Sequence, residues 1–102
     1  MENSDYIYID LGYSPIPSGC RRLLNEVTIK KDGKIWRIHK NDPDPFPSKP
    51  HAHNVESGLK MDLSNGDLYF MGALQQRVNK KHLLDLRSMI AKYDIILPDL
   101  SV

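Results

Sequence analysis

The chain has 102 residues, a formal net charge of +1, one cysteine, and a composition that is 40% hydrophobic and 26% charged. This length supports a single domain over residues 1–102 with one modest core, and the near-zero charge excludes a basic surface spread over the whole molecule. Cys20 cannot form an internal disulfide, the first five residues are acidic, and no apolar run is long enough to span a membrane. The sequence therefore predicts a cytoplasmic protein without a membrane partner.

The N-terminal half predicts strands. Residues 6–11 are rich in aromatic and β-branched side chains, and a loop over 12–19 follows. A short helix over 20–25 is one interpretation of the next segment; the other is a direct entry into a strand. Residues 26–30 and 34–39 alternate around a Lys-Asp-Gly turn, which predicts a β-hairpin. In its second strand Trp36 and Ile38 share one face, and Ile35, Arg37 and His39 share the other.

A second hairpin is predicted over residues 59–63 and 68–71, joined by the turn sequence Ser-Asn-Gly-Asp. Leu59, Met61 and Leu63 should then face the core, while Lys60 and Asp62 should face away from it. Residues 72–77 are expected to form a connection or a frayed helical turn.

The C-terminal part predicts a helix over residues 80–93 with Asn79 as its N-cap. Spacings of three and four place apolar side chains on one stripe, flanked by Leu84 and Met89; the stripe consists of Leu83, Leu86, Ile90 and Tyr93. Residues 95–97 form either a short edge strand or a packed tail. The predicted fold class is α+β: an antiparallel sheet of two β-hairpins plus an N-terminal strand, with the C-terminal helix packed on one face.

One segment, residues 39–54, holds three of the four histidines, four of the seven prolines and two aspartates. Because prolines cannot donate to a strand ladder, the prolines favour a stiff, extended surface loop between two strands. His51 and His53 are two residues apart, so they share a face of an extended backbone. The loop can bring them close to His39 and Arg37.

The first interpretation is RNA cleavage without a metal. Imidazole titrates near neutral pH, so His51 and His53 are candidates for the general base and acid, with His39 as a substitute for either. A nearby cation would stabilise the charge on the reacting phosphate; the candidates are Arg37, Lys40 and Lys49. The expected product is a 2′,3′-cyclic phosphate, and no cofactor is needed.

A family resemblance supports this interpretation. The strand sequence at 35–39 (IWRIH), the Phe46-Pro47 dipeptide and the Pro50-His51-Ala52-His53 segment resemble the pattern of small prokaryotic toxin–antitoxin proteins of the TumE type. The resemblance covers about twenty of the 102 residues. It implies a ribonuclease toxin that acts on cellular RNA and is neutralised by a protein antitoxin, and it assigns site roles to Arg37, His51 and His53.

Two alternatives stay open. The His-x-His pair, together with His39 and Asp42 or Asp44, could bind a divalent metal such as zinc, either as a simple metal site or as the centre of a metallohydrolase. Alternatively, the proline-rich segment could be a rigid docking element of a non-catalytic interaction module or an antitoxin-like inhibitor. The toxin-like endoribonuclease is the preferred prediction, and the sequence does not predict an oligomeric state.

Overall fold

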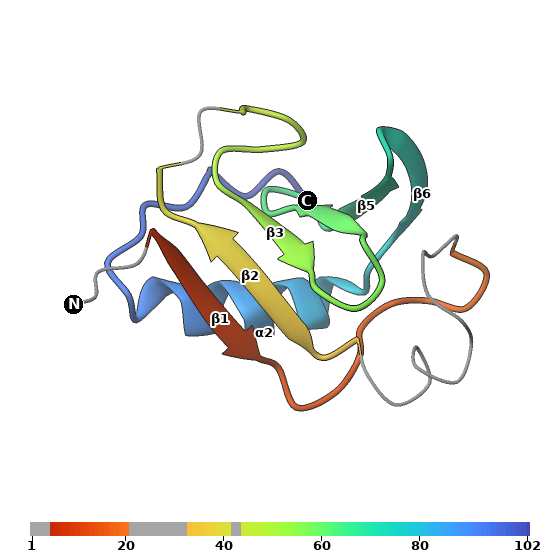
Figure 1. Cartoon of the computed structure of the whole chain (residues 1–102), viewed down its shortest axis with the longest axis horizontal. Helices are drawn as coiled ribbons and strands as arrows, with labels where there is room; N and C mark the ends of the chain where they lie inside the picture. The colour runs from red at the N-terminus through yellow and green to blue at the C-terminus, as the bar shows by residue number, and fades with distance from the viewer. Residues whose placement is uncertain (1–4, 21–32, 42–43) are drawn as a thin grey trace.

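The computed structural model describes residues 5–20, 33–41 and 44–102, which form one antiparallel sheet and one helix. The six strands lie side by side in sequence order, and helix α2 lies behind them in Figure 1. The predicted α+β class, with an antiparallel sheet and a C-terminal helix, is confirmed. In chain order the elements are β1 (Tyr6–Asp10), β2 (Ile35–His39), β3 (His51–Asn54), β4 (Lys60–Asp62), β5 (Asp67–Phe70), β6 (Ala73–Arg77) and α2 (Lys80–Ala91).

Strands β1 and β2 form as their alternating patterns predict. Ile7 and Ile9 of β1 face the core and its two tyrosines are exposed, while Trp36 and Ile38 of β2 are fully buried. The neighbours of β2 are β1 on one edge and β3 on the other. The strand expected over 26–30 as the hairpin partner of β2 lies outside the described residues, as does nearly all of the helix expected over 20–25.

Two strands differ from the prediction. Residues 51–54, expected as part of a loop, form the central strand β3, which pairs with β2 and β4. Strand β3 is only four residues long and has none of the residue types that are enriched in strands, so it carries almost no strand signal of its own. The frayed turn or connection expected over 72–77 is wrong, because residues 73–77 form β6 on β5. Strand β6 is largely exposed on both faces, so its sequence has no alternation to reveal it.

The predicted hairpin of β4 and β5 is confirmed, with Asn65 and Gly66 in its turn. Leu59, Met61 and Leu63 are fully buried, as expected. Asp62 is also buried, which differs from its expected solvent-facing position. The reason is local.

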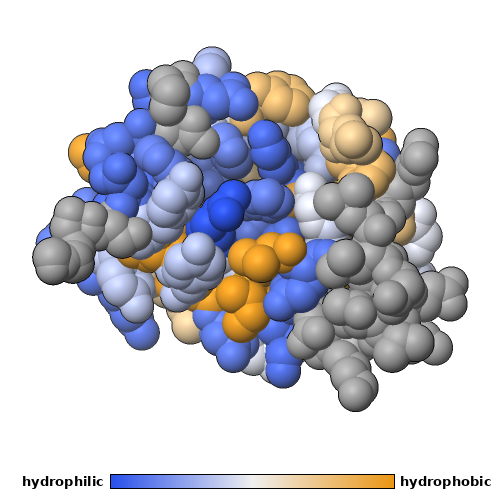
Figure 2. Space-filling view, viewed as in Figure 1, coloured by the Kyte–Doolittle hydropathy of each residue, from blue (hydrophilic) through white to orange (hydrophobic). Residues whose placement is uncertain are grey.

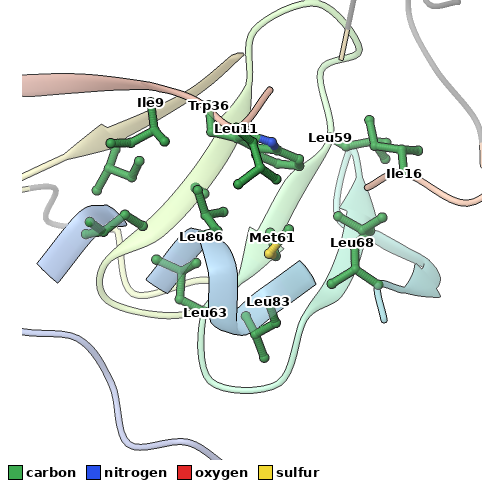
Figure 3. Close-up of a cluster of buried hydrophobic side chains, with 14 of the residues drawn as sticks. Ile9, Leu11, Ile16, Trp36, Leu59, Met61, Leu63, Leu68, Leu83 and Leu86 are labelled. Carbon is green, nitrogen blue, oxygen red and sulfur yellow. The ribbon is translucent and has the colours of Figure 1, made fainter. Parts of the chain in front are cut away.

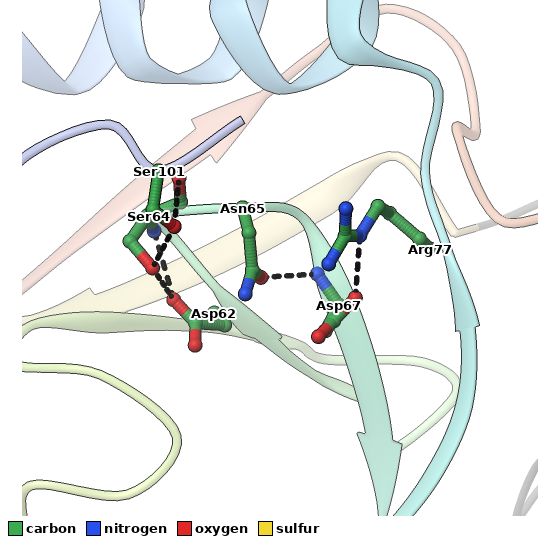
Figure 4. Close-up of polar contacts among 6 residues, drawn as sticks. All are labelled: Asp62, Ser64, Asn65, Asp67, Arg77 and Ser101. Atoms are coloured by element: carbon green, nitrogen blue, oxygen red, sulfur yellow. Dashed lines mark hydrogen bonds and ion pairs between the residues drawn. The ribbon is translucent and has the colours of Figure 1, made fainter.

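The turn encloses the carboxylate of Asp62. Its Oδ1 accepts hydrogen bonds from the Ser64 backbone N–H at 2.8 Å and from the Ser64 hydroxyl at 2.6 Å (Figure 4). The C-terminal tail closes over the same turn, since the backbone N–H of Ser101 donates to the Ser64 carbonyl at 2.8 Å. In the same view Arg77 of β6 pairs with Asp67 of β5 at 2.7 Å. The β4–β5 turn is therefore held by its own polar side chains and by the tail.

Helix α2 begins as predicted, because the Asn79 side chain accepts the Lys81 backbone N–H at 2.8 Å. Its apolar stripe packs against the sheet to make the core in Figure 3, with Leu83, Leu86 and Ile90 fully buried. The helix ends at Ala91, before the expected end at residue 93.

The chain turns after the helix through Asp94, whose φ is +59°. Tyr93 is consequently 51% exposed, so its expected place in the buried stripe is wrong. Residues 95–97 form a packed tail, with Ile95 and Leu97 against the core and no strand. Within the described part of the chain, no helix is both long and apolar enough to cross a membrane.

Candidate functional site

The face of the sheet opposite α2 carries a row of polar and aromatic side chains. Strand pairing places Tyr8 beside Arg37, Arg37 beside His53, His53 beside Lys60, and Lys60 beside Tyr69. Strand alternation turns all five away from the buried apolar positions of their strands. Figure 2 looks onto this face, where hydrophilic residues gather over β2 and β3. The same alternation that builds the core therefore gathers polar and aromatic side chains on the opposite face.

A pocket of about 200 Å³ opens on this face. It brings together the three histidines of the 39–54 segment and the arginine that precedes them, from strands β2 and β3. A tyrosine of β1 and a lysine of β4 complete the lining. The described lining residues are Tyr6, Arg37, His39, His51, His53 and Lys60. None of them has a carboxylate side chain. We call it the histidine pocket.

His53 is held in its neutral form by its surroundings. A guanidinium nitrogen of Arg37 donates to His53 Nδ1 at 2.8 Å, so the neutral ring carries its proton on Nε2. Burial lowers the pKa of His53 below its ordinary value, and the nearby charges of Arg37, Lys60 and His51 lower it further. At neutral pH His53 therefore carries no charge and orients Arg37.

His51 has the opposite tautomer. Its Nδ1 donates to the backbone carbonyl of Ser48 at 2.9 Å, so the lone pair of the neutral ring is on Nε2. Ser48 is itself fixed, because its hydroxyl donates to the Pro50 carbonyl at 2.6 Å and accepts the Leu63 backbone N–H at 3.0 Å. The proline-rich loop thus folds back onto the end of β4 and orients the His51 ring.

His39 lies at the edge of the pocket. Its Nδ1 accepts the backbone N–H of Asn41 at 3.1 Å, and its ring meets the ring of Tyr6 edge-on with 4.6 Å between centroids. The Arg37 guanidinium carbon lies 5.0 Å from the centroid of the same Tyr6 ring, which is a cation–π distance. Tyr6 therefore positions both His39 and Arg37.

Lys40 and Lys49 do not line the histidine pocket. They line a second, larger cavity of about 550 Å³, together with the other residues Asn41, Pro50, Tyr93, Asp94, Ile95, Ile96 and His39. His39 is common to both cavities. Inside the histidine pocket the cations are Arg37 and Lys60. The structure thus places Lys40 and Lys49 in a different cavity from His51 and His53, and His39 lines both cavities.

The described lining of the histidine pocket holds no carboxylate ligand for a divalent cation. Asp42, an expected ligand, lies outside the described residues, and Asp44 Oδ1 accepts the Phe46 backbone N–H at 3.0 Å within its own turn. Within the described ranges, no three His, Cys, Asp or Glu side chains are grouped so that they could hold a metal ion. Arg37 bonds His53 directly and Lys60 lines the same space, so a divalent cation would meet two positive charges.

Three residues that shape the pocket were not assigned to it from the sequence. Lys60 was placed correctly on the polar face of its strand, but its neighbour His53 was not known to be in a strand. Tyr6 faces the pocket because β1 pairs with β2 in the register Tyr6 to His39. Ser48 had no sequence signal, since its role depends on a backbone contact to β4.

Comparison of the chain with protein-family models, curated proteins and solved structures found no match. The resemblance to TumE-type toxins therefore stays a prediction, and the function has to be argued from the pocket.

Proposed function

We propose that this protein is a toxin-like endoribonuclease that cleaves RNA by histidine acid–base chemistry without a metal. The observation that carries the proposal is the histidine pocket, which combines three imidazoles with two cations and has no carboxylate among its described lining residues. Such a lining favours an anionic substrate, and a phosphodiester is an anion that imidazoles can cleave. A volume of about 200 Å³ is suited to a phosphate group and the adjoining part of a ribose.

The reaction is a transesterification of the RNA backbone. His51 takes the proton of the ribose 2′-hydroxyl through Nε2, while its Nδ1–H stays bonded to the Ser48 carbonyl. The 2′-oxygen then bonds to phosphorus, and the bond from phosphorus to the 5′-oxygen breaks. The products are a 2′,3′-cyclic phosphate and a 5′-hydroxyl.

The other side chains have separate roles. His39 gives a proton to the leaving 5′-oxygen from its imidazolium form, in which Nδ1 is protonated and no longer accepts the Asn41 N–H. Arg37 and Lys60 stabilise the extra negative charge on the phosphorane. His53 is a positioning residue, because its lowered pKa keeps it neutral and its Nδ1 is bonded to Arg37. We further propose that the protein acts in the cytoplasm and is neutralised by a protein antitoxin.

The decisive experiment uses the purified full chain and single-stranded RNA of mixed sequence in excess chelator. We expect cleavage that leaves 2′,3′-cyclic phosphate ends, identified by mass spectrometry, and no cleavage at a 2′-deoxy position. His51→Asn should lower kcat/KM about 10²–10⁴-fold, the range for loss of a general base. His82→Asn is the matched control, because His82 lies on α2 outside the pocket.

Two results would reject the proposal: ends other than cyclic phosphate, or His51→Asn protein that is as active as the His82→Asn control. Identical purification of both variants separates the protein's own activity from a contaminating nuclease. Circular dichroism and thermal unfolding of each variant check that the fold is retained.

A second candidate function is a non-catalytic interaction module. The observation that favours it is the β5–β6 hairpin, which exposes Met71 of its turn at 84% and Leu74 of the edge strand β6 at 57%. Exposed apolar side chains on a sheet edge are typical of a surface that binds another protein. If the purified chain leaves every RNA probe intact, this interpretation replaces the first.

A further inference from the structure

We propose that the larger cavity is a subsite for the nucleotide that adjoins the scissile phosphate, with the base against Tyr93 and the nucleotide's outer phosphate at Lys40 and Lys49. This inference rests on the proposed function, and it names the substrate as single-stranded RNA. Nothing in the roles assigned above uses Tyr93 or the tail that follows it.

The position of the cavity supports this assignment. Its lining includes His39, which also lines the histidine pocket, so the two cavities adjoin at this residue. The cavity volume of about 550 Å³ lies within the range of small-molecule sites, about 300–1,000 Å³. The histidine pocket, at about 200 Å³, is below that range and has no room for a whole nucleotide.

The walls of the cavity have two chemical characters. The apolar lining residues are Pro50, Tyr93, Ile95 and Ile96. Tyr93 and Ile96 are 51% and 89% exposed, which leaves their apolar surface open to a ligand. An apolar surface with an exposed aromatic ring is the type of surface on which nucleic acid bases stack.

The positive charge in the lining comes from Lys40 and Lys49, whose ammonium groups attract a phosphate. Asp94 is in the same lining, and its carboxylate repels a phosphate but can accept a hydrogen bond from a base amino group. The phosphate therefore belongs beside the lysines and the base beside Tyr93. A nucleotide is a ligand that has both an apolar ring face and an anionic group.

The backbone presents Tyr93 in a fixed place. Its N–H donates to the Ile90 carbonyl at 3.0 Å, and Asp94 then turns the chain through its φ of +59°. Ile95 and Ile96, which follow this turn, line the same cavity as Tyr93. A base can reach this wall only when it is unstacked from its neighbours, which favours single-stranded over duplex RNA.

The test uses trinucleotide probes with one ribose 2′-hydroxyl at the scissile position and 2′-O-methyl groups elsewhere. An abasic residue is placed on either side of the scissile phosphate. For the unmodified protein we expect the abasic residue on one side to lower kcat/KM about tenfold, the loss typical for one stacked base. Tyr93→Leu should cleave the intact probe about tenfold more slowly and show little further loss with the abasic probe.

Two control variants isolate the cavity. Tyr8→Leu removes another exposed tyrosine, which lies on strand β1. This variant should still show the tenfold loss in kcat/KM with the abasic probe, because Tyr8 lines neither cavity. A probe that carries the nucleotide's outer phosphate should be cleaved faster than the same probe without it. The double variant Lys40→Ala with Lys49→Ala should lose this rate advantage, whereas Lys80→Ala should keep it. Ile96→Asp serves if Tyr93→Leu does not fold, because Ile96 is 89% exposed and its replacement leaves the core intact.

The outcomes separate this inference from the proposed function. Cleavage that is insensitive to an abasic residue on either side, or an equal abasic effect in Tyr93→Leu, overturns the subsite and leaves the ribonuclease proposal standing. The converse result has two parts. A fully 2′-O-methyl trinucleotide binds in calorimetry and Tyr93→Leu weakens this binding, but no RNA is cleaved. That result would reject the ribonuclease proposal and retain the nucleotide site.

Discussion

Ser48 connects the proline-rich loop to the sheet, so its replacement by alanine should destabilise the protein more than its size suggests. The side chain is buried and makes two hydrogen bonds, to the Pro50 carbonyl at 2.6 Å and from the Leu63 N–H at 3.0 Å. Loss of the first contributes about 0.5–1.5 kcal/mol, and a Leu63 N–H left buried without a partner costs about 1–3 kcal/mol. Together we expect the free energy of unfolding to fall by about 2–3 kcal/mol.

The measurement is urea unfolding followed by circular dichroism, with thermal unfolding as a second probe. For a domain of about 100 residues the expected loss corresponds to a decrease in Tm of about 10–20 °C with an unchanged m-value. Ser88→Ala is the matched control, because Ser88 is exposed on α2 and its replacement should change stability by less than about 0.5 kcal/mol. If Ser48→Ala is no less stable than Ser88→Ala, the loop is not fastened as described.

Three further measurements test the packing and the electrostatics. Leu86→Ala should lower the free energy of unfolding by about 2–5 kcal/mol, because Leu86 is fully buried between α2 and the sheet, whereas Leu84→Ala should have a small effect because Leu84 is 40% exposed. The lowered pKa of His53 means that the unfolded chain binds a proton near pH 6.5 while the folded chain does not; stability should therefore fall as the pH drops below about 6.5, and His53→Gln should flatten that decline in urea titrations. Tyr13→Phe removes the 2.6 Å hydrogen bond from the phenol to Asp85 Oδ2, which is the main cause of the lowered pKa of Asp85. The pKa of Asp85 should therefore rise in an NMR titration of this variant. An unchanged pKa would contradict the hydrogen bond.

The parts of the fold that the sequence predicted are those in which each segment carries its own pattern. Helix α2 has an apolar stripe and an N-cap at Asn79, and the β4–β5 hairpin has alternation and an Asn-Gly turn. Both are local signals, so they survive without knowledge of the neighbouring elements. The end of α2 was less predictable, because the turn at Asp94 interrupts an apolar spacing that continues in the sequence.

The parts that the sequence did not predict depend on neighbours. The four residues of β3 become a strand because β2 and β4 supply hydrogen bonds on both of its edges. The sequence showed that His51 and His53 share a face, and that Arg37 and His39 share another strand's face. It did not contain the register that places Arg37 beside His53. The closeness of the imidazoles to one another and to Arg37 was therefore a hypothesis, and the direct bond between Arg37 and His53 depends on this register.

The described lining of the histidine pocket carries an excess of positive charge. Arg37 and Lys60 flank a neutral His53, and no carboxylate among the described lining residues balances their charges. A bound anion would supply that balance, and it would also favour the protonated form of His53 by offsetting the charge of Arg37. By linkage the two effects are reciprocal: anion binding raises the pKa of His53, and protonation of His53 strengthens anion binding. A pocket built in this way should bind inorganic phosphate more tightly as the pH falls toward the pKa of His53, whether or not it cleaves RNA.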